Sequence, residues 1–135
     1  MIMLDSTACI DYLRGDQNLK LKISKLDPFL ATTSITHYEV MIGILNAKRK
    51  RSSEFSKNLI QKWAEFRTNL KILTLNQKEA EMAAKIYDEL ELKGKMIDDN
   101  DILIAGIMRA NEITQIITKN KKHYENIDEI QVIDY

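Results

Sequence analysis

The chain has 135 residues, of which 44% are hydrophobic and 30% are charged, a composition typical of one globular domain with a sizeable core. Lysine and arginine together number 20, as do aspartate and glutamate, so net charge indicates no particular class of partner. Cys9 is the only cysteine, which excludes an intrachain disulfide, and no apolar run approaches membrane-spanning length, so we expect a cytoplasmic protein.

The opening segment, residues 1–13, predicts a buried strand followed directly by a helix. Four apolar residues precede Asp5, and apolar residues recur at helical spacing from Ala8 to Leu13. Ser6 or Thr7 has the side-chain oxygen expected at the N-cap of that helix. Asp5 is therefore expected at the carboxyl end of a strand, where open α/β sheets bind their ligands.

Residues 14–46 predict a short helix, a strand and a longer helix. The short helix, with its apolar residues at helical spacing, ends before Asp27-Pro28, and residues 29–33 form the strand. Ser34 is the expected cap of a helix over residues 34–46. The face of this helix that is expected to point into the core consists of Ile35, Tyr38, Ile42 and Leu45.

Glu39 falls within this apolar stripe. A carboxylate among core positions is costly unless a partner or a polar pocket accommodates it. The alternative is that Glu39 lies at the edge of the stripe and reaches water. The spacing alone leaves both interpretations open.

The segment from residue 48 to residue 92 predicts two more helices around a strand. The basic run Lys48–Arg51 is interpreted as a solvated turn, with RNA-backbone binding as the alternative. The helix over residues 53–69 carries Trp63, which is interpreted as a core or partner-interface residue. This helix and its neighbours are predicted to form an apolar surface for a second copy or another protein. A strand at residues 70–75 leads to a helix capped by Asn76, with the inward residues Ala80, Ala83, Ala84, Tyr87 and Leu90.

Three acids surround the start of a strongly apolar helix. Gly94 ends the preceding helix, and Asp98, Asp99 and Asp101 then lead into the apolar run 102–108. A helix that is apolar on nearly all sides is buried. One carboxylate suffices to cap a helix N-terminus, so three within four residues exceed that role.

The remaining segments complete an α/β pattern. Residues 115–118 form a strand, residues 119–124 a loop at its carboxyl end, and residues 131–135 a final strand. Strands that alternate with helices predict a mainly parallel sheet of about five strands, with helices on both faces. We expect one domain, residues 1–135, with this three-layer architecture.

The candidate site consists of carboxylates from separate segments: Asp5, Glu39, Asp101 and, as a fourth, Asp99. Carboxylates gathered in one cleft repel one another unless a cation lies between them. Mg²⁺, with Mn²⁺ as a substitute, prefers such oxygen ligands, and the Cys/His spacing of a zinc site is missing. Such an ion typically serves phosphoryl chemistry.

Four segments carry a family resemblance: LDSTACIDYL (4–13), SITHYEVMIGI (34–44), DDNDILIAGIM (98–108) and IITKNKKHY (116–124). They resemble the motifs of the PIN domain, and more narrowly those of the VapC toxins of prokaryotic VapBC toxin–antitoxin pairs. The resemblance covers nearly the whole chain. It implies an α/β fold and a Mg²⁺- or Mn²⁺-dependent endoribonuclease that is usually dimeric and is inhibited by a cognate VapB-type antitoxin.

The resemblance also implies roles for individual residues. Asp5, Glu39 and Asp101 match the family's metal-binding acids, and Asp99 lies where some members carry an additional acid. The polar segment that borders the site corresponds to Thr118 and Asn120, and the neighbouring Lys119, Lys121 and Lys122 are candidates for binding the RNA backbone. His123 departs from the family, because many members carry Asp or Glu at that place. Its imidazole is a candidate to line the site by orienting a water or contacting phosphate, with no role as the alternative, and the substitution bears on a second metal more than on the first.

Other functions remain as alternatives. The departure at His123 is compatible with a PIN scaffold that binds RNA or a protein partner without cleavage. A haloacid-dehalogenase-type phosphatase would need Asp-x-Asp after the first strand, where this chain has Asp5-Ser6-Thr7. A receiver domain would need an aspartate after the third strand, where Leu75-Asn76 stands.

Overall fold

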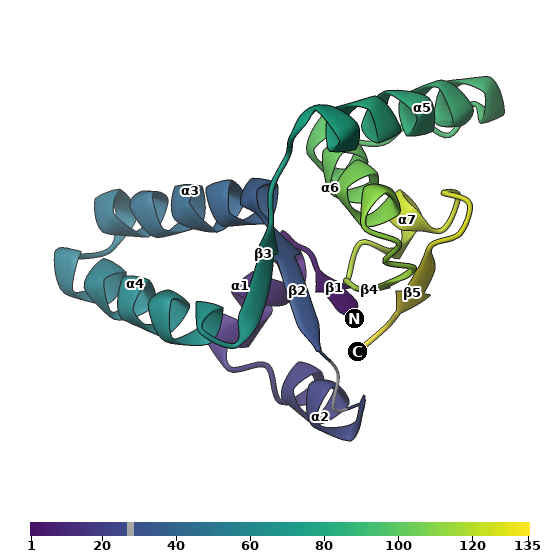
Figure 1. The fold of residues 1–135 in the computed structure, drawn as a ribbon. Helices are drawn as coiled ribbons and strands as arrows, with labels where there is room; N and C mark the ends of the chain where they lie inside the picture. Colours follow the sequence, from purple (N-terminus) through teal and green to yellow (C-terminus); the bar gives the residue numbers. More distant parts are fainter. Residues whose placement is uncertain (27–28) are drawn as a thin grey trace.

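The computed structural model describes residues 1–26 and 29–135, and Figure 1 shows their arrangement. Within these residues the chain forms five strands and seven helices. In chain order they are β1 (Ile2–Leu4), α1 (Ser6–Arg14), α2 (Gln17–Leu26), β2 (Leu30–Thr33), α3 (Ser34–Lys50), α4 (Ser53–Arg67), β3 (Leu70–Leu73), α5 (Gln77–Lys93), α6 (Asp99–Ala110), β4 (Gln115–Ile117), α7 (Lys121–Tyr124) and β5 (Gln131–Ile133). The predicted break at Asp27-Pro28 lies outside the described residues.

The five strands form one sheet in the order β3-β2-β1-β4-β5, and every pairing is parallel. The predicted α/β fold with a parallel central sheet is therefore confirmed. Because the strands are parallel, their carboxyl ends lie along one edge of the sheet. Each described helix is too short or too polar to cross a bilayer.

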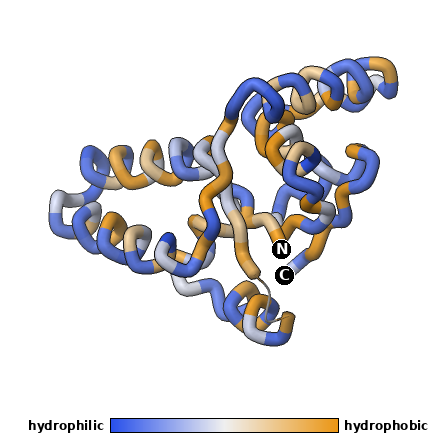
Figure 2. Tube along the Cα trace, in the orientation of Figure 1, coloured by the Kyte–Doolittle hydropathy of each residue, from blue (hydrophilic) through white to orange (hydrophobic). Residues whose placement is uncertain are grey.

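Two apolar cores lie on the two faces of the sheet. Alternate residues of β1 divide between them, since Met3 packs with α5 and α6 whereas Ile2 and Leu4 pack with α1, α3 and α4. Figure 1 shows the latter helices on one side of the strands and α5 with α6 on the other. Along the helices, hydrophobic and hydrophilic residues alternate, as expected when each helix buries one face (Figure 2).

The inward face of α3 differs from the predicted one. Tyr38, Ile42 and Leu45 are exposed, whereas Val40 and Ile44 are buried together with the small polar residue Thr36. Thr36 is accommodated because its hydroxyl accepts a hydrogen bond from Thr33 Oγ1 at 3.2 Å. The apolar pattern predicted the wrong face because Thr36, a polar residue, occupies a core position where its hydroxyl is hydrogen-bonded.

The inward face of α5 was also predicted only in part. Ala83 and Leu90 are buried as expected, and Ile86 joins them. The predicted inward residues Ala80, Ala84 and Tyr87 are instead exposed. The reason is that α5 packs chiefly on α6, so only a narrow stripe of it is covered.

Helix ends were harder to place than helix positions. Asp5, not Ser6 or Thr7, caps α1, and Thr33, not Ser34, caps α3. The basic run predicted as a turn forms the last turn of α3 up to Lys50, and α7 occupies part of the predicted loop 119–124. Gly94 ends α5 as predicted, in the left-handed conformation with φ 65°.

Trp63 is a core residue. Its side chain is only 1% exposed, and its Nε1–H donates a 2.9 Å hydrogen bond to His37 Nδ1. The sequence left core and interface open for this tryptophan, and the structure decides for the core. The apolar residues of α4 that reach the surface are Phe55 and Ile60.

Candidate metal centre

The predicted acids converge on the carboxyl edge of the sheet. Asp5 directly follows β1, and Thr118 directly follows the neighbouring strand β4. Glu39 lies in the second turn of α3, which begins where β2 ends. Parallel pairing thus gathers residues that are more than 100 positions apart in the sequence.

Asp5 is fully buried and held by three hydrogen bonds. Its Oδ1 accepts the Ala8 backbone N–H at 3.0 Å and the Thr7 hydroxyl at 2.7 Å, and its Oδ2 accepts the Thr118 hydroxyl at 2.5 Å. Burial raises the pKa of Asp5, these hydrogen bonds lower it, and the negative charge of Asp101 adds to the rise. The carboxylate is therefore fixed in place but not neutralised by a cationic side chain.

Asp101 faces the same space from the first turn of α6. It is 7% exposed, and both of its oxygens are bonded to α7. The Tyr124 hydroxyl donates to Oδ1 at 2.8 Å, and His123 Nδ1 lies 2.5 Å from Oδ2. His123 thus contacts Asp101 directly.

Glu39 is half-buried, and its Oε1 is enclosed without a hydrogen-bond partner. Burial and the neighbouring charge of Asp101 raise the pKa of Glu39, and Asp5 adds to the effect. Ser6 and Asn100 oppose this shift without reversing it. Glu39 combines the two interpretations that the sequence left open, because part of its side chain reaches water whereas Oε1 is enclosed.

The three acids lie close enough for their charges to act on one another, because, besides the effect of burial, Asp101 raises the pKa of Asp5 and both of these acids raise the pKa of Glu39. Tyr124 reports this most clearly, because burial raises the pKa of its phenol and the charges of Asp5, Asp101 and Glu39 raise it further. An orphaned oxygen on Glu39 and two buried like charges are unfavourable in a closed fold. A divalent cation among these oxygens would relieve both conditions, so the residues present fit such an ion.

Asp98 and Asp99 point to different places. Asp98 offers an oxygen that groups with an oxygen of Asp101 and a ring nitrogen of His123, all within 4.8 Å of one another. Asp99 instead lines a shallow cleft between α5 and α6, beside Tyr87 and Leu103. The catalytic role predicted for Asp99 therefore stays a prediction without a structural argument in its favour.

The other residues predicted to border the site have distinct surroundings. Thr118 accepts the Asn120 backbone N–H at 2.8 Å, so Asn120 contributes through its main chain. Lys119 is half-exposed and lies 3.2 Å from Asp11 and 3.4 Å from Asp16, and its contact with RNA stays a prediction. Lys121 is exposed and lies 4.0 Å from Asp134.

Sequence reasoning did not assign site roles to Thr7, Tyr124 or Asp98. Thr7 and Tyr124 hold the two central acids by hydrogen bonds. A tyrosine directly after His123 was visible as a pattern, but its contact with Asp101 depends on how α7 packs on α6. The role of Asp98 depends on the same packing.

The sequence model of the PIN domain family matches residues 2–129. The chain belongs to the PIN domain family. Among curated proteins, this PIN domain is 26% identical over 128 residues to Ribonuclease VapC2 of Rickettsia felis, covering 93% of the chain and 90% of the relative. It is 29% identical to Ribonuclease VapC1 of Methanocaldococcus jannaschii, covering 95% of the chain and 82% of that protein.

A solved structure has a closely similar fold. The crystal structure of VapBC2 from Rickettsia felis, bound to a DNA fragment from its promoter, superposes with a TM-score of 0.84 at 24% identity. The match covers 100% of this PIN domain and 99% of that chain. The PIN fold is therefore established along the whole chain, including the edge that carries the acids.

Proposed function

We propose that this PIN domain is a metal-dependent endoribonuclease and the toxin of a type II toxin–antitoxin pair in the cytoplasm. The observation that carries the proposal is the gathering of Asp5, Glu39 and Asp101 at the carboxyl edge of the sheet, with a buried, unpartnered Glu39 oxygen. The relatives named as VapC ribonucleases and the similar VapBC structure support it.

Asp5, Glu39 and Asp101 would hold the ion, which we propose to be Mg²⁺ with Mn²⁺ as a substitute. When bound, such an ion supplies Lewis acidity toward phosphate and lowers the pKa of water. Both ions accept carboxylate oxygens readily.

The remaining residues position the acids and the substrate. Thr7 and Thr118 orient the two oxygens of Asp5, while Tyr124 fixes Asp101. Glu39 is the acid with a free oxygen, so it is suited to orient a water or accept its proton. Lys121 and Lys122, both exposed, are positioned to attract the RNA backbone next to His123.

A PIN domain that binds RNA without cutting it remains the second candidate. The observation in its favour is His123, whose ring nitrogen occupies the neighbourhood of Asp101 where many family members have an acid. It predicts RNA binding that survives removal of metal, with no cleavage products.

Cleavage of single-stranded RNA by the purified protein tests the proposal. We expect products with Mg²⁺ or Mn²⁺, none with EDTA, and recovery when the metal is restored. Asp5→Asn should lose cleavage because it removes a buried metal-binding charge, whereas Asp88→Asn, on the exposed face of α5, should retain it. Full activity of Asp5→Asn, or RNA binding without cleavage by the native protein, would refute the nuclease.

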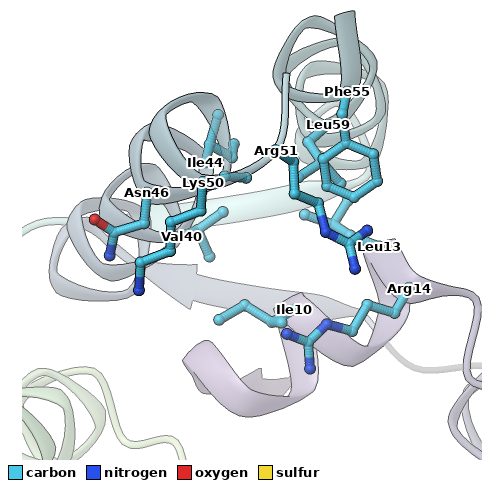
Figure 3. A pocket seen from close by; sticks show the side chains of 12 residues that line it. Ile10, Leu13, Arg14, Val40, Ile44, Asn46, Lys50, Arg51, Phe55 and Leu59 are labelled. Carbon is cyan, nitrogen blue, oxygen red and sulfur yellow. The ribbon is translucent and has the colours of Figure 1, made fainter. Parts of the chain in front are cut away.

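An apolar groove between α1, α3 and α4 is our proposed contact for the antitoxin (Figure 3). It has a volume of about 500 Å³, and its floor includes Val40, Ile44 and Leu59. Figure 3 shows the guanidinium groups of Arg14 and Arg51 at its rim. The groove therefore suits an amphipathic segment that carries apolar residues and at least one acid.

We predict that Arg14→Glu weakens binding of the co-expressed antitoxin by about tenfold or more, because it reverses a charge at the groove rim. Titration calorimetry measures this effect. Lys25→Glu is the matched control, since Lys25 is also a basic residue in the last turn of a helix but lies outside the groove. Equal affinities of the two variants would contradict this placement of the antitoxin.

The expected homodimer remains a separate prediction, which light scattering checks.

A further inference from the structure

His123 and Asp98 are potential metal ligands that do not belong to the proposed centre of Asp5, Glu39 and Asp101. One oxygen of Asp98, one oxygen of Asp101 and one ring nitrogen of His123 lie within 4.8 Å of one another. They come from two elements that pack together, the start of α6 and the short helix α7. The packing of these two helices therefore brings three potential metal ligands into one group.

The side chain of Asp98 does not cap helix α6, although the residue stands at the N-cap position. Its carboxylate is exposed and groups with Asp101 and His123. An N-cap aspartate normally uses its oxygen on a backbone N–H, so this arrangement leaves an acid available for a cation.

The ring of His123 is held against Asp101. Its Nδ1 lies 2.5 Å from Asp101 Oδ2, and 32% of its side chain is exposed. This contact fixes the ring of His123 beside the carboxylate, so a ring nitrogen and the oxygens of Asp101 face the same space. The nearby unpartnered Glu39 oxygen adds a second sign that a cation belongs in this region.

We propose that Asp98, Asp101 and His123 form a mixed oxygen–nitrogen site that binds a transition-metal ion, such as Mn²⁺ or Zn²⁺, in preference to Mg²⁺. Mg²⁺ prefers oxygen ligands in near-octahedral geometry, whereas imidazole nitrogen favours first-row transition metals. The site extends the proposed nuclease centre, because Asp101 belongs to both. Its ligand preference is nevertheless independent of RNA cleavage.

Calorimetric titration of the full-length, metal-free protein with Zn²⁺, Mn²⁺ and Mg²⁺ at pH 7.5 tests the preference. We expect His123→Asp to weaken Zn²⁺ binding by about tenfold or more, an effect typical of a damaged metal site, and to leave Mg²⁺ binding unchanged or tighter. Asp98→Asn should also weaken Zn²⁺ binding. Asp88→Asn is the matched control, because this exposed acid on α5 lies outside the Asp98–Asp101–His123 group.

The histidines supply a second readout that does not depend on affinity. The chain contains only two, His37 and His123, so their imidazole ¹⁵N signals are easily assigned. Zn²⁺ should shift a ring nitrogen of His123 strongly. The Nδ1 of His37 should shift little, because it is engaged by Trp63. Circular dichroism of each variant confirms that it is folded.

The outcomes separate this inference from the nuclease proposal. Unchanged His123 signals, or an equal ratio of Zn²⁺ to Mg²⁺ affinity in the native protein and His123→Asp, would overturn the mixed-ligand site. If the mixed-ligand site is overturned in this way but the protein cleaves RNA with Mg²⁺, the nuclease proposal still stands. Selective Zn²⁺ binding without any RNA cleavage would support the site and refute the nuclease.

Discussion

Replacing Glu39 with glutamine is expected to abolish RNA cleavage and, at the same time, to stabilise the metal-free protein. Loss of a positioned acid–base group typically lowers activity by roughly 100-fold or more. Glutamine has nearly the same shape, so the fold should be retained. The opposite signs of the two effects make this variant more informative than one that only loses activity.

The stability gain follows from the surroundings of Glu39. Burial and the charges of Asp101 and Asp5 raise the pKa of Glu39, so its ionised form is disfavoured in the folded state. Removing that charge should increase the free energy of unfolding by about 0.5–1 kcal/mol, the lower part of the range for stabilising substitutions, because water screens part of the side chain.

The pH dependence of this gain has a definite sign. A carboxyl group with a raised folded-state pKa destabilises the fold when it is ionised, and this penalty disappears as pH falls through the raised pKa. The difference in melting temperature between Glu39→Gln and the native protein should therefore be largest at neutral pH and shrink under acidic conditions.

Calorimetric melting with and without Mn²⁺ checks this prediction, alongside an RNA cleavage assay. Mn²⁺ should stabilise the native protein more than Glu39→Gln, because the native carboxylate is a ligand of the ion in the proposed centre. Glu91→Gln, on the exposed face of α5, should change neither activity nor stability. If the metal-free Glu39→Gln protein is less stable than the native one, the ionised Glu39 carboxylate does not destabilise the fold, and the prediction is wrong.

Gly106→Ala is expected to be strongly destabilising, because α5 and α6 touch at this glycine. A Cβ atom at position 106 would lie 2.6 Å from Ala83 Cβ and 2.7 Å from the Ala83 backbone N and Cα. Overpacking of a tight core typically costs about 1–3 kcal/mol, and a clash with backbone atoms places this case at the upper end. Urea unfolding of the variant measures the loss.

Gly43→Ala is the matched control for this substitution. Gly43 also lies inside a helix, α3, but a Cβ there would meet no atom within 4 Å. Alanine in that helix interior should stabilise the protein by about 0.5–1 kcal/mol, because glycine loses more conformational freedom on folding. Adding Ala83→Gly to Gly106→Ala should restore only part of the stability, since the backbone contacts remain. A Gly106→Ala protein as stable as the native one would disprove the tight helix contact.

This helix contact also matters for the site. Asp101 lies one and a half turns before Gly106 on α6, and α6 presents Asp101 to Tyr124 and His123. If α6 shifts to accommodate a larger residue at 106, the acid moves with it. We therefore expect any folded Gly106→Ala protein to cleave RNA more weakly than Gly43→Ala.

The sequence by itself determined the sheet and the identity of the central acids. Short apolar runs ending in polar residues marked β1 and β4, and the resemblance to the PIN domain singled out Asp5, Glu39 and Asp101. These features are local in the chain. An apolar run or a motif can be recognised without knowing what packs against it.

The tertiary structure alone decided which helix faces are covered and what surrounds each acid. Tyr38 and Tyr87 are apolar enough for the core, yet they are exposed because none of the described helices and strands covers them. Asp98 and Tyr124 join the site only because α7 packs on α6. Burial and ligand grouping depend on contacts between segments distant in the chain, and spacing within one segment carries no information about them.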